Sequence, residues 1–137
     1  MATDSTRIGR ALVVDDDPAM RSLIARELSR RLDTVAVATF TDALALVQEH
    51  ELPFEAVVTD LRLGDGPTGM DLLVAAKRLR PSCVRILVSG EMTEDVAATM
   101  AVEGLADAAF GKPWPYGAIA EAILAALEDR AVRSCSA

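Results

Sequence analysis

Four short apolar runs, separated by longer amphipathic stretches, constrain the fold of this chain more than any other feature. Each run is rich in Val, Ile and Leu and lacks alternation of apolar and polar residues, which is typical of strands buried on both faces of a parallel sheet. The runs are residues 11–14, 35–38, 56–59 and 84–89, and a weaker fifth run follows at 108–111. Strands that alternate with helices in this way predict an α/β fold, a doubly wound five-stranded parallel sheet covered by helices on both faces.

The stretches between the runs carry helix-boundary residues as well as helical spacing. Asp17 and Pro18 predict the N-cap and the first residue of a helix. Thr41 is expected to cap the second helix and Thr93 the fourth, because a threonine side chain can accept a hydrogen bond from the first turn. The third helix is expected to stop before Pro81, since proline disfavours helical backbone at the residue before it.

The chain has room for one domain, because 137 residues can enclose a single core and little else. We expect this domain to occupy residues 10–130, with tails at 1–9 and 131–137. The formal net charge of −7 has the wrong sign for binding nucleic acid or an anionic membrane surface. The sequence contains no leader-like segment and no apolar stretch of membrane-spanning length, so we expect a cytoplasmic protein.

The histidine and the two cysteines do not form a zinc or disulfide pattern. Cys83 and Cys135 are far apart and show no C-x-x-C spacing. His50 follows a helical stretch among polar neighbours, and we interpret it as a solvated residue at a helix end. Chemistry based on a thiol or an imidazole is therefore not expected.

Charged and polar residues gather where the predicted strands end. In an open parallel sheet, ligands bind at the carboxyl ends of the strands, next to the point where the strand order reverses. With the order 2-1-3-4-5, the first and third strands are neighbours, so the acids that follow them converge. The residues at these strand ends are Asp15, Asp16, Asp17, Asp60, Ser89 and Lys112.

This set of side chains predicts a cation site with phosphoryl chemistry. Carboxylates in one crevice repel each other by roughly 1 to 4 kcal/mol per close pair, so a cation must offset their charge. Oxygen ligands without Cys or His select a hard cation such as Mg²⁺. An aspartate next to Mg²⁺ and Lys112 can attack phosphorus, and Ser89 can donate to a phosphoryl oxygen. Asp17 is better explained as a helix cap than as a metal ligand.

Four sequence blocks in register resemble the receiver domain of two-component response regulators, of the single-domain kind found in chemotaxis regulators. The blocks are LVVDDDP (12–18), VVTDLRL (57–63), ILVSGE (86–91) and GKPW (111–114). The resemblance implies a flavodoxin-like three-layer fold and a role in a phosphorelay. A sensor histidine kinase or a phosphotransfer protein would donate the phosphoryl group of a phosphohistidine to an aspartate, and a downstream protein partner would recognise the result.

The resemblance also implies which residues bind the metal ion and the phosphoryl group. Asp60 matches the phosphoacceptor. Asp15 and Asp16 match the acidic pair that binds Mg²⁺, with Asp16 as the direct ligand and Asp15 acting through water. Asp60 itself and the backbone carbonyl of Arg62 complete the expected ligand set.

A second group of residues matches the family positions that surround the phosphoryl group. Ser89 and Lys112 match the hydroxyl residue and the lysine that contact it, and Gly90 matches the small residue beside the hydroxyl. Arg62 and Glu91 are expected to flank the site with opposite charges. An ion pair between them would obstruct the hydrolytic water and so modulate the lifetime of the phosphoryl group.

The sequence departs from the family pattern at the loop after Asp60 and in the fifth strand. Gly64 stands where the family usually has proline, and Gly69 lies nine residues after Asp60 rather than eight. Ala109 stands where many receivers have a switching aromatic residue, and we interpret the neighbouring Phe110 as a core residue. Trp114 is expected either to contact a partner protein or to pack against the fifth helix.

Other functional classes fit the sequence less well. A receiver-like interaction module that is not phosphorylated would usually lack one of the acids or the lysine, and none is missing here. A small-molecule phosphatase would need an acid where Arg62 stands, and no nucleotide-binding glycine motif occurs. We therefore do not expect this chain to be an enzyme that acts on other substrates. It would catalyse only its own phosphorylation and dephosphorylation. The sequence leaves open whether the chain acts alone, belongs to a longer protein or forms a homodimer.

Overall fold

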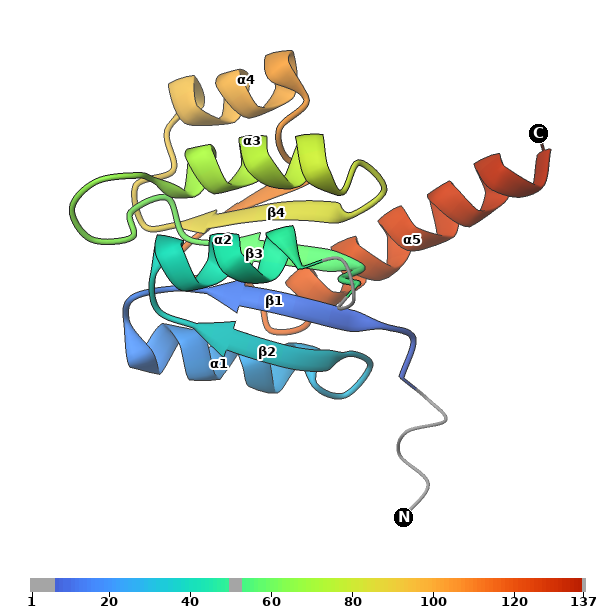
Figure 1. Ribbon diagram of the computed structural model, residues 1–137, viewed down its shortest axis with the longest axis horizontal. Coiled ribbons are helices and arrows are strands. Elements are labelled where there is room, and N and C mark those ends of the chain that lie inside the picture. Colours follow the sequence, from blue (N-terminus) through green and yellow to red (C-terminus); the bar gives the residue numbers. More distant parts are fainter. Residues whose placement is uncertain (1–6, 50–52, 137) are drawn as a thin grey trace.

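The computed structural model describes residues 7–49 and 53–136, and it contains one parallel sheet (Figure 1). The strand order in this described part is β2-β1-β3-β4-β5, which confirms the predicted order. The interpretation of His50 lies outside the described residues. The strands are β1 (Arg10–Val14), β2 (Asp33–Val37), β3 (Ala56–Thr59), β4 (Val84–Ser89) and β5 (Ala108–Gly111).

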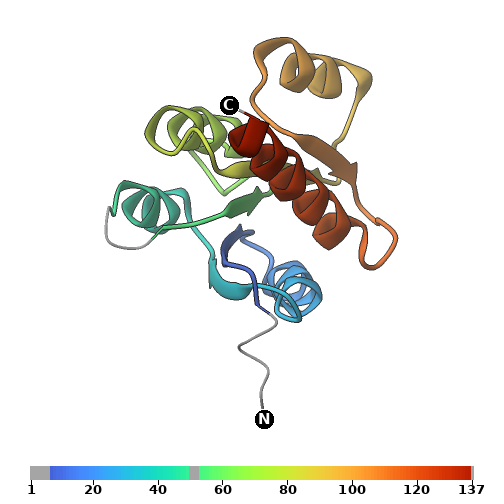
Figure 2. The same ribbon diagram turned by 90° about the vertical axis from the view of Figure 1, so that its right-hand side faces the viewer.

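Helices cover both faces of the sheet, so the molecule has the predicted three layers (Figure 2). Helices α1 and α5 pack on one face, while α2, α3 and α4 pack on the other. The helices are α1 (Pro18–Leu28), α2 (Phe40–Gln48), α3 (Gly69–Leu79), α4 (Glu94–Glu103) and α5 (Ala118–Ser136).

Strand β1 shows why the apolar runs lack alternation. Its odd-numbered residues Ala11 and Val13 lie in the core under α1 and α5, and its even-numbered residues Leu12 and Val14 lie in the core under α2 and α3. Both faces of the strand are therefore apolar. The edge strands β2 and β5 differ from the prediction, because their residues are only partly buried or exposed.

Most of the predicted helix boundaries follow from local hydrogen bonds, with one correction. Asp17 caps α1 by accepting a hydrogen bond from the Ala19 N–H, and Thr93 caps α4 in the same way. The prediction of Thr41 as the cap of α2 was wrong. Thr39 has the extended backbone of an N-cap and accepts from the Asp42 N–H, so Thr41 lies inside the first turn.

The C-terminal helix is longer than predicted. Helix α5 continues through Ser136, so the expectation that residues 131–137 form a tail was wrong for residues 131–136. An ion pair between Arg133 and Asp129, with an N–O distance of 2.9 Å, spans one turn of this extension. The C-terminal half of α5 extends beyond the sheet (Figure 1). The domain bounds of 10–130 stay a prediction.

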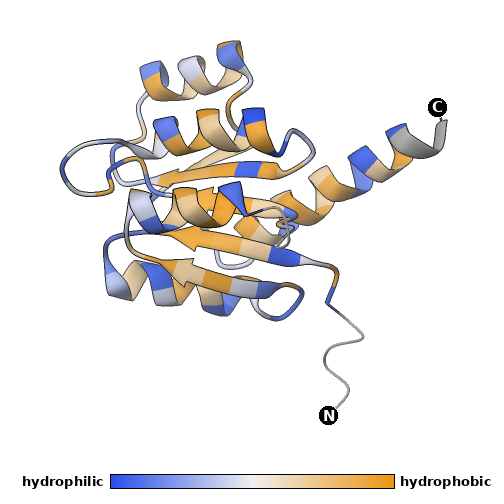
Figure 3. Cartoon of the chain, in the orientation of Figure 1, coloured by the Kyte–Doolittle hydropathy of each residue, from blue (hydrophilic) through white to orange (hydrophobic). Residues whose placement is uncertain are grey.

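Hydropathy follows the layers of the fold (Figure 3). The strands are mostly hydrophobic, and the helices combine hydrophobic and hydrophilic residues. Fully burying one large aliphatic side chain contributes roughly 1.5 to 3 kcal/mol, so the two apolar layers against the sheet stabilise the fold. None of the helices in the described residues is both long and apolar enough to span a membrane.

Candidate functional site

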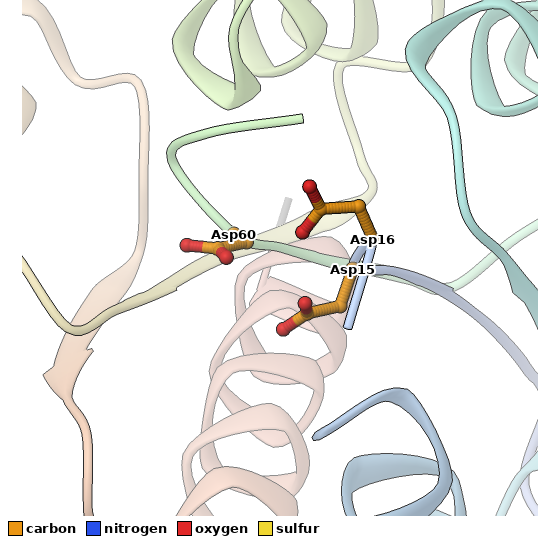
Figure 4. A group of neighbouring side chains, drawn as sticks. All are labelled: Asp15, Asp16 and Asp60. Atoms are coloured by element: carbon orange, nitrogen blue, oxygen red, sulfur yellow. The ribbon is translucent and has the colours of Figure 1, made fainter. Parts of the chain in front are cut away.

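Three aspartates from neighbouring strands form an acidic cluster at the carboxyl edge of the sheet (Figure 4). The parallel pairing of β1 and β3 aligns Val14 with Thr59, so the residues that follow these two strands lie side by side. One carboxylate oxygen from each of Asp15, Asp16 and Asp60 lies within 4.8 Å of the others. Asp15 is fully buried, Asp60 is partly buried and Asp16 is exposed.

The ammonium group of Lys112 joins two of these acids. Its Nζ lies 2.9 Å from Asp15 Oδ2 and 3.1 Å from Asp60 Oδ2. The backbone N–H of Lys112 donates to the Ser89 carbonyl at 3.1 Å, which holds the lysine at the end of β4. The peptide bond between Lys112 and Pro113 is cis.

The protonation of the cluster follows from burial and from this lysine. Burial raises the pKa of Asp15, and hydrogen bonds from the Asp17 N–H and Lys112 offset part of that effect. Burial also lowers the pKa of Lys112, but its bonds to Asp15 and Asp60 outweigh burial and raise its pKa overall. Lys112 is therefore a cation at neutral pH, and it contacts two of the three carboxylates, those of Asp15 and Asp60.

The donor set of the cluster fits a hard divalent cation. Its members within the described part of the chain are carboxylates, with no thiolate or imidazole among them. The Asp60 carboxylate is oriented by the Leu61 N–H, which donates to its Oδ1 at 2.7 Å. The backbone carbonyl of Arg62 stays a predicted ligand.

Two further predicted residues, Ser89 and Gly90, lie at the end of β4. The Ser89 side chain is 2% exposed, and its Oγ accepts a hydrogen bond from the Glu91 N–H at 3.0 Å. A Cβ atom added to Gly90 would meet no atom within 4 Å. The small residue beside the hydroxyl therefore leaves open space next to the site.

Arg62 and Glu91 form the ion pair that the sequence predicted. The Arg62 Nε donates to Glu91 Oε2, and this contact lowers the pKa of Glu91. The two side chains come from the loops after β3 and β4 and are 70% and 52% exposed. The pair therefore lies on the solvent side of these two loops.

The position nine residues after Asp60 requires glycine for steric reasons. A Cβ atom added to Gly69 would lie 1.9 Å from the backbone oxygen of Asp60, so only glycine allows α3 to begin this close to Asp60. The Gly69 N–H donates to the Leu61 carbonyl at 2.7 Å. The extra residue is accommodated by a loop in which Gly64 and Gly66 have positive φ angles of 85° and 101°.

The structure shows where the residues in and after the fifth strand lie. Phe110 packs against the core under α1 and α5, as predicted, and Ala109 is exposed. Trp114 is partly buried against the same core, which includes residues of α5, and its Nε1 donates to Glu27 at 3.0 Å. Contact between Trp114 and a partner protein stays a prediction.

Three charged residues with structural roles were missed by the sequence analysis. Arg21 donates to the Asp15 carbonyl at 2.9 Å, and Glu27 and Arg85 are buried. Two of the three had a visible signal: Arg85 interrupts an apolar strand, and Glu27 stands beside Leu28 on the apolar side of α1. A buried charge needs hydrogen-bond partners, and most of the partners of Glu27 and Arg85 are distant in sequence.

Solved structures with this fold include receivers from archaea and bacteria. A CheY-like receiver domain protein from Methanospirillum hungatei has a TM-score of 0.82 and 27% identity, covering 92% of this chain and 98% of its own. A response regulator protein from Burkholderia pseudomallei, with a phosphorylated aspartic acid, a calcium ion and citrate, has a TM-score of 0.74 and 27% identity. This similarity covers 94% of the present chain and 75% of the other.

Sequence comparisons agree with the structural ones. The response regulator protein PilR of Pseudomonas aeruginosa is 31% identical over 125 residues, which cover 88% of this chain and 26% of PilR. The chain thus spans about a quarter of the length of the curated relatives it matches first. Residues 11–124 match the family model of the response regulator receiver domain, and the chain therefore belongs to that family.

Proposed function

We propose that this protein accepts a phosphoryl group on Asp60 from the phosphohistidine of a sensor histidine kinase or a phosphotransfer protein. The observation that carries this proposal is the contact of Lys112 Nζ with both Asp15 and Asp60 inside the three-carboxylate cluster. The relative from Burkholderia pseudomallei, which has a phosphorylated aspartic acid, supports the same chemistry. The two-component phosphorelay is the biological setting that family membership implies.

The transfer needs little chemistry beyond alignment and charge neutralisation. An oxygen of Asp60 forms a bond to phosphorus while the bond from phosphorus to the donor imidazole nitrogen breaks. The electron pair of that bond stays on the nitrogen, which takes up a proton. Lys112 offsets the charge of the acceptor and of the phosphoryl oxygens, and the Ser89 hydroxyl donates to one of those oxygens.

We further propose Mg²⁺ as the cofactor. Asp15, Asp16, Asp60 and the backbone carbonyl of Arg62 would hold the ion, and the all-oxygen character of the cluster supports this choice. When bound, the ion supplies positive charge to the phosphoryl oxygens during transfer. Lys112 alone offsets only part of the charge of three carboxylates and a phosphoryl group.

Intact mass spectrometry after incubation with acetyl phosphate tests the proposal. We expect one phosphoryl adduct on the wild-type protein in the presence of Mg²⁺ and none after Mg²⁺ is removed with a chelator. Asp60→Asn is expected to abolish the adduct, because the amide is not a nucleophile. A wild-type protein without an adduct, whose melting temperature Mg²⁺ also fails to raise, would contradict the proposal and favour a non-phosphorylated interaction module.

The Arg62–Glu91 pair is proposed to set the lifetime of the phosphoryl group by obstructing the hydrolytic water. Its exposed position between the loops that follow β3 and β4 supports this role. The double variant Arg62→Ala/Glu91→Ala is expected to lose its phosphoryl group several times faster than the wild type. An unchanged rate of dephosphorylation in the double variant would show that the pair has no such role.

The output of phosphorylation is proposed to be a changed binding surface on α4, β5 and α5 for a downstream protein. Ser89 and Lys112 connect the site to the ends of β4 and β5, which lead into α4 and α5. With Ala109 at the usual aromatic position, the switch on this surface would operate without that side chain. Catalysis by this chain would be limited to its own phosphorylation and dephosphorylation.

A further inference from the structure

Helix α1 buries a carboxylate that the phosphoryl chemistry does not use. Glu27 is 3% exposed and lies beside the buried Leu28. The face of α1 that carries these residues packs against α5, where Ile119 and Ile123 belong to the same core. A carboxylate in such apolar surroundings must be hydrogen-bonded, because the burial of a charged group without partners is strongly unfavourable.

Both oxygens of Glu27 accept a hydrogen bond from the segment that follows Lys112. Oε1 accepts from Trp114 Nε1 at 3.0 Å, and Oε2 accepts from the backbone N–H of Ala120 at 2.9 Å. Ala120 is the third residue of α5, so its N–H belongs to the first turn, which has no partner within the helix. Gly117, just before α5, has no side chain that could cap it, and Glu27 supplies the cap from another helix.

These bonds fix the segment that begins at the lysine of the site. Trp114 follows Lys112 by two residues, and Glu27 anchors it and the start of α5 on α1. On the other side, the Lys112 N–H is bound to the Ser89 carbonyl. The backbone of the lysine therefore lies between two anchors, one on β4 and one on α1.

We propose that Glu27 is a positioning residue: by holding Trp114 and the first turn of α5, it fixes the placement of the Lys112 ammonium against Asp15 and Asp60. The consequence for phosphoryl transfer rests on the proposed function, whereas the effect on the segment after Lys112 does not. Glutamine cannot replace this carboxylate, because its amide has one oxygen for two N–H donors, and its NH₂ group would face the other donor.

Glu27→Gln and a matched variant, Glu55→Gln, test the proposal. Glu55 Oε1 also accepts from a backbone N–H, that of Arg10 at 2.6 Å, but at the start of β1, at the edge of the sheet opposite the site. The two variants thus lose a similar bond at opposite ends of the strands. Amide hydrogen exchange of the unliganded proteins is measured well below their melting temperatures.

We expect the amides of Lys112 and Ala120 to exchange at least tenfold faster in Glu27→Gln and at the wild-type rate in Glu55→Gln. If exchange became faster at Ala120 alone, Glu27 would act only as a helix cap, and the proposal would be overturned. The proposal would also be overturned if the two variants changed the exchange rate of the Lys112 amide equally. This measurement needs no phosphorylation, so it decides the role of Glu27 in the segment even if the wild-type protein accepts no phosphoryl group.

The rate of phosphorylation by acetyl phosphate tests the consequence for chemistry. At saturating Mg²⁺, Glu27→Gln is expected to react at least fivefold more slowly than the wild type and Glu55→Gln within twofold of it. The Mg²⁺ concentration at half-maximal rate is expected to stay within twofold, because the carboxylates of the cluster are intact. An unchanged rate in Glu27→Gln would overturn the positioning role.

Trp114→Phe provides a second variant in case Glu27→Gln folds poorly. It removes the indole N–H and keeps an aromatic ring, so it breaks one of the two bonds of Glu27. We expect a smaller reduction in rate in the same direction, and a double variant Glu27→Gln/Trp114→Phe that is no slower than Glu27→Gln alone. Independent, multiplying effects would show that Glu27 does not act through Trp114.

Discussion

Helices α1 and α4, which follow two of the strands that end at the site, are attached to the molecule very differently. Helix α1 buries Ile24, Glu27 and Leu28, and Glu27 ties it to α5. Helix α4, all of whose residues are described, buries only Met100. In Figures 1 and 2, α4 stands at one end of the molecule, next to α3.

The C-terminal end of α4 is held by cations in addition to the apolar contacts of Met100 and Leu105. Arg85, buried in β4, donates to the backbone carbonyls of Gly104 and Leu105, which directly follow the helix. Lys77 on α3 donates to the Glu103 carbonyl at 2.7 Å. These donors satisfy carbonyls at a helix end, where positive charge is favoured.

The difference in packing indicates that α1 and α4 have different roles in the same fold. Helix α1 and its contact with α5 keep the groups of the site in place. Helix α4 buries only Met100 among its residues, so we expect a displacement of α4 to cost less free energy than one of α1. Elements that respond to a signal are commonly drawn from the less stable parts of a protein.

The largest expected effect compares the packing of the two helices. Ile24→Ala is expected to lower the free energy of unfolding by about 3 to 4 kcal/mol, and Met100→Ala by about 2 kcal/mol, because a loosely packed helix can relax into the cavity. Both side chains are 2% exposed, so they start from equal burial. Chemical denaturation provides the measurement, and equal losses would remove the distinction between α1 and α4.

The next effect concerns the attachment of α4 through its C-terminus. Arg85→Met is expected to lower the free energy of unfolding by roughly 2 to 3 kcal/mol, because buried carbonyls lose their donor. Amide exchange should accelerate in α4 and stay unchanged in α1. Lys77→Met is the control, since Lys77 is exposed and its loss is expected to cost less than about 1 kcal/mol. Equal acceleration in both helices would argue against a local attachment.

The smallest effect concerns the charge of the site itself. Because the pKa of Asp15 is raised, the folded protein binds its proton more tightly than the unfolded chain, and Asp15 lowers stability as the pH rises through the raised pKa. Asp15→Asn is therefore expected to raise the melting temperature by a few degrees at neutral pH without Mg²⁺.

The same variant has a pH signature. Its advantage should disappear below the ordinary pKa of 3.8, where Asp15 is protonated in both states. Added Mg²⁺ should stabilise the wild type and not the variant. Melting curves between pH 3 and pH 8 provide the measurement, and a variant less stable than the wild type at neutral pH would show that the Lys112 contact outweighs burial.

Much of the fold could be predicted because the relevant signals are local. Strand β4 is an apolar run interrupted only by Arg85 before Ser89 ends it, and Asp17 and Thr93 cap helices through bonds to residues two or three positions away. The prediction of Thr41 as a cap failed, because α2 begins at Phe40, earlier in the chain than that prediction requires. Thr39 has the extended backbone of an N-cap and accepts from the Asp42 N–H.

The residues of the candidate site could be predicted from the sequence, but the hydrogen bonds that hold the neighbouring segments could not. Parallel pairing brings the ends of β1 and β3 together whatever the details of packing, so Asp15 and Asp60 were expected to meet. No such rule predicts the hydrogen bonds that hold the segments around the site. Glu27 meets Trp114 and Ala120, which are 87 and 93 residues away in the sequence.

The sequence by itself determined the order of strands and helices, the edge of the sheet that carries the acids, and which acids and which lysine meet there. These follow from the spacing of hydrophobic residues, from the ends of the apolar runs and from the motifs that the chain shares with the receiver family. Only the tertiary structure decided which N–H groups and carbonyls the buried charges of Glu27 and Arg85 would meet. A buried charge takes its partners from whatever elements pack around it, and that packing is a property of the whole fold.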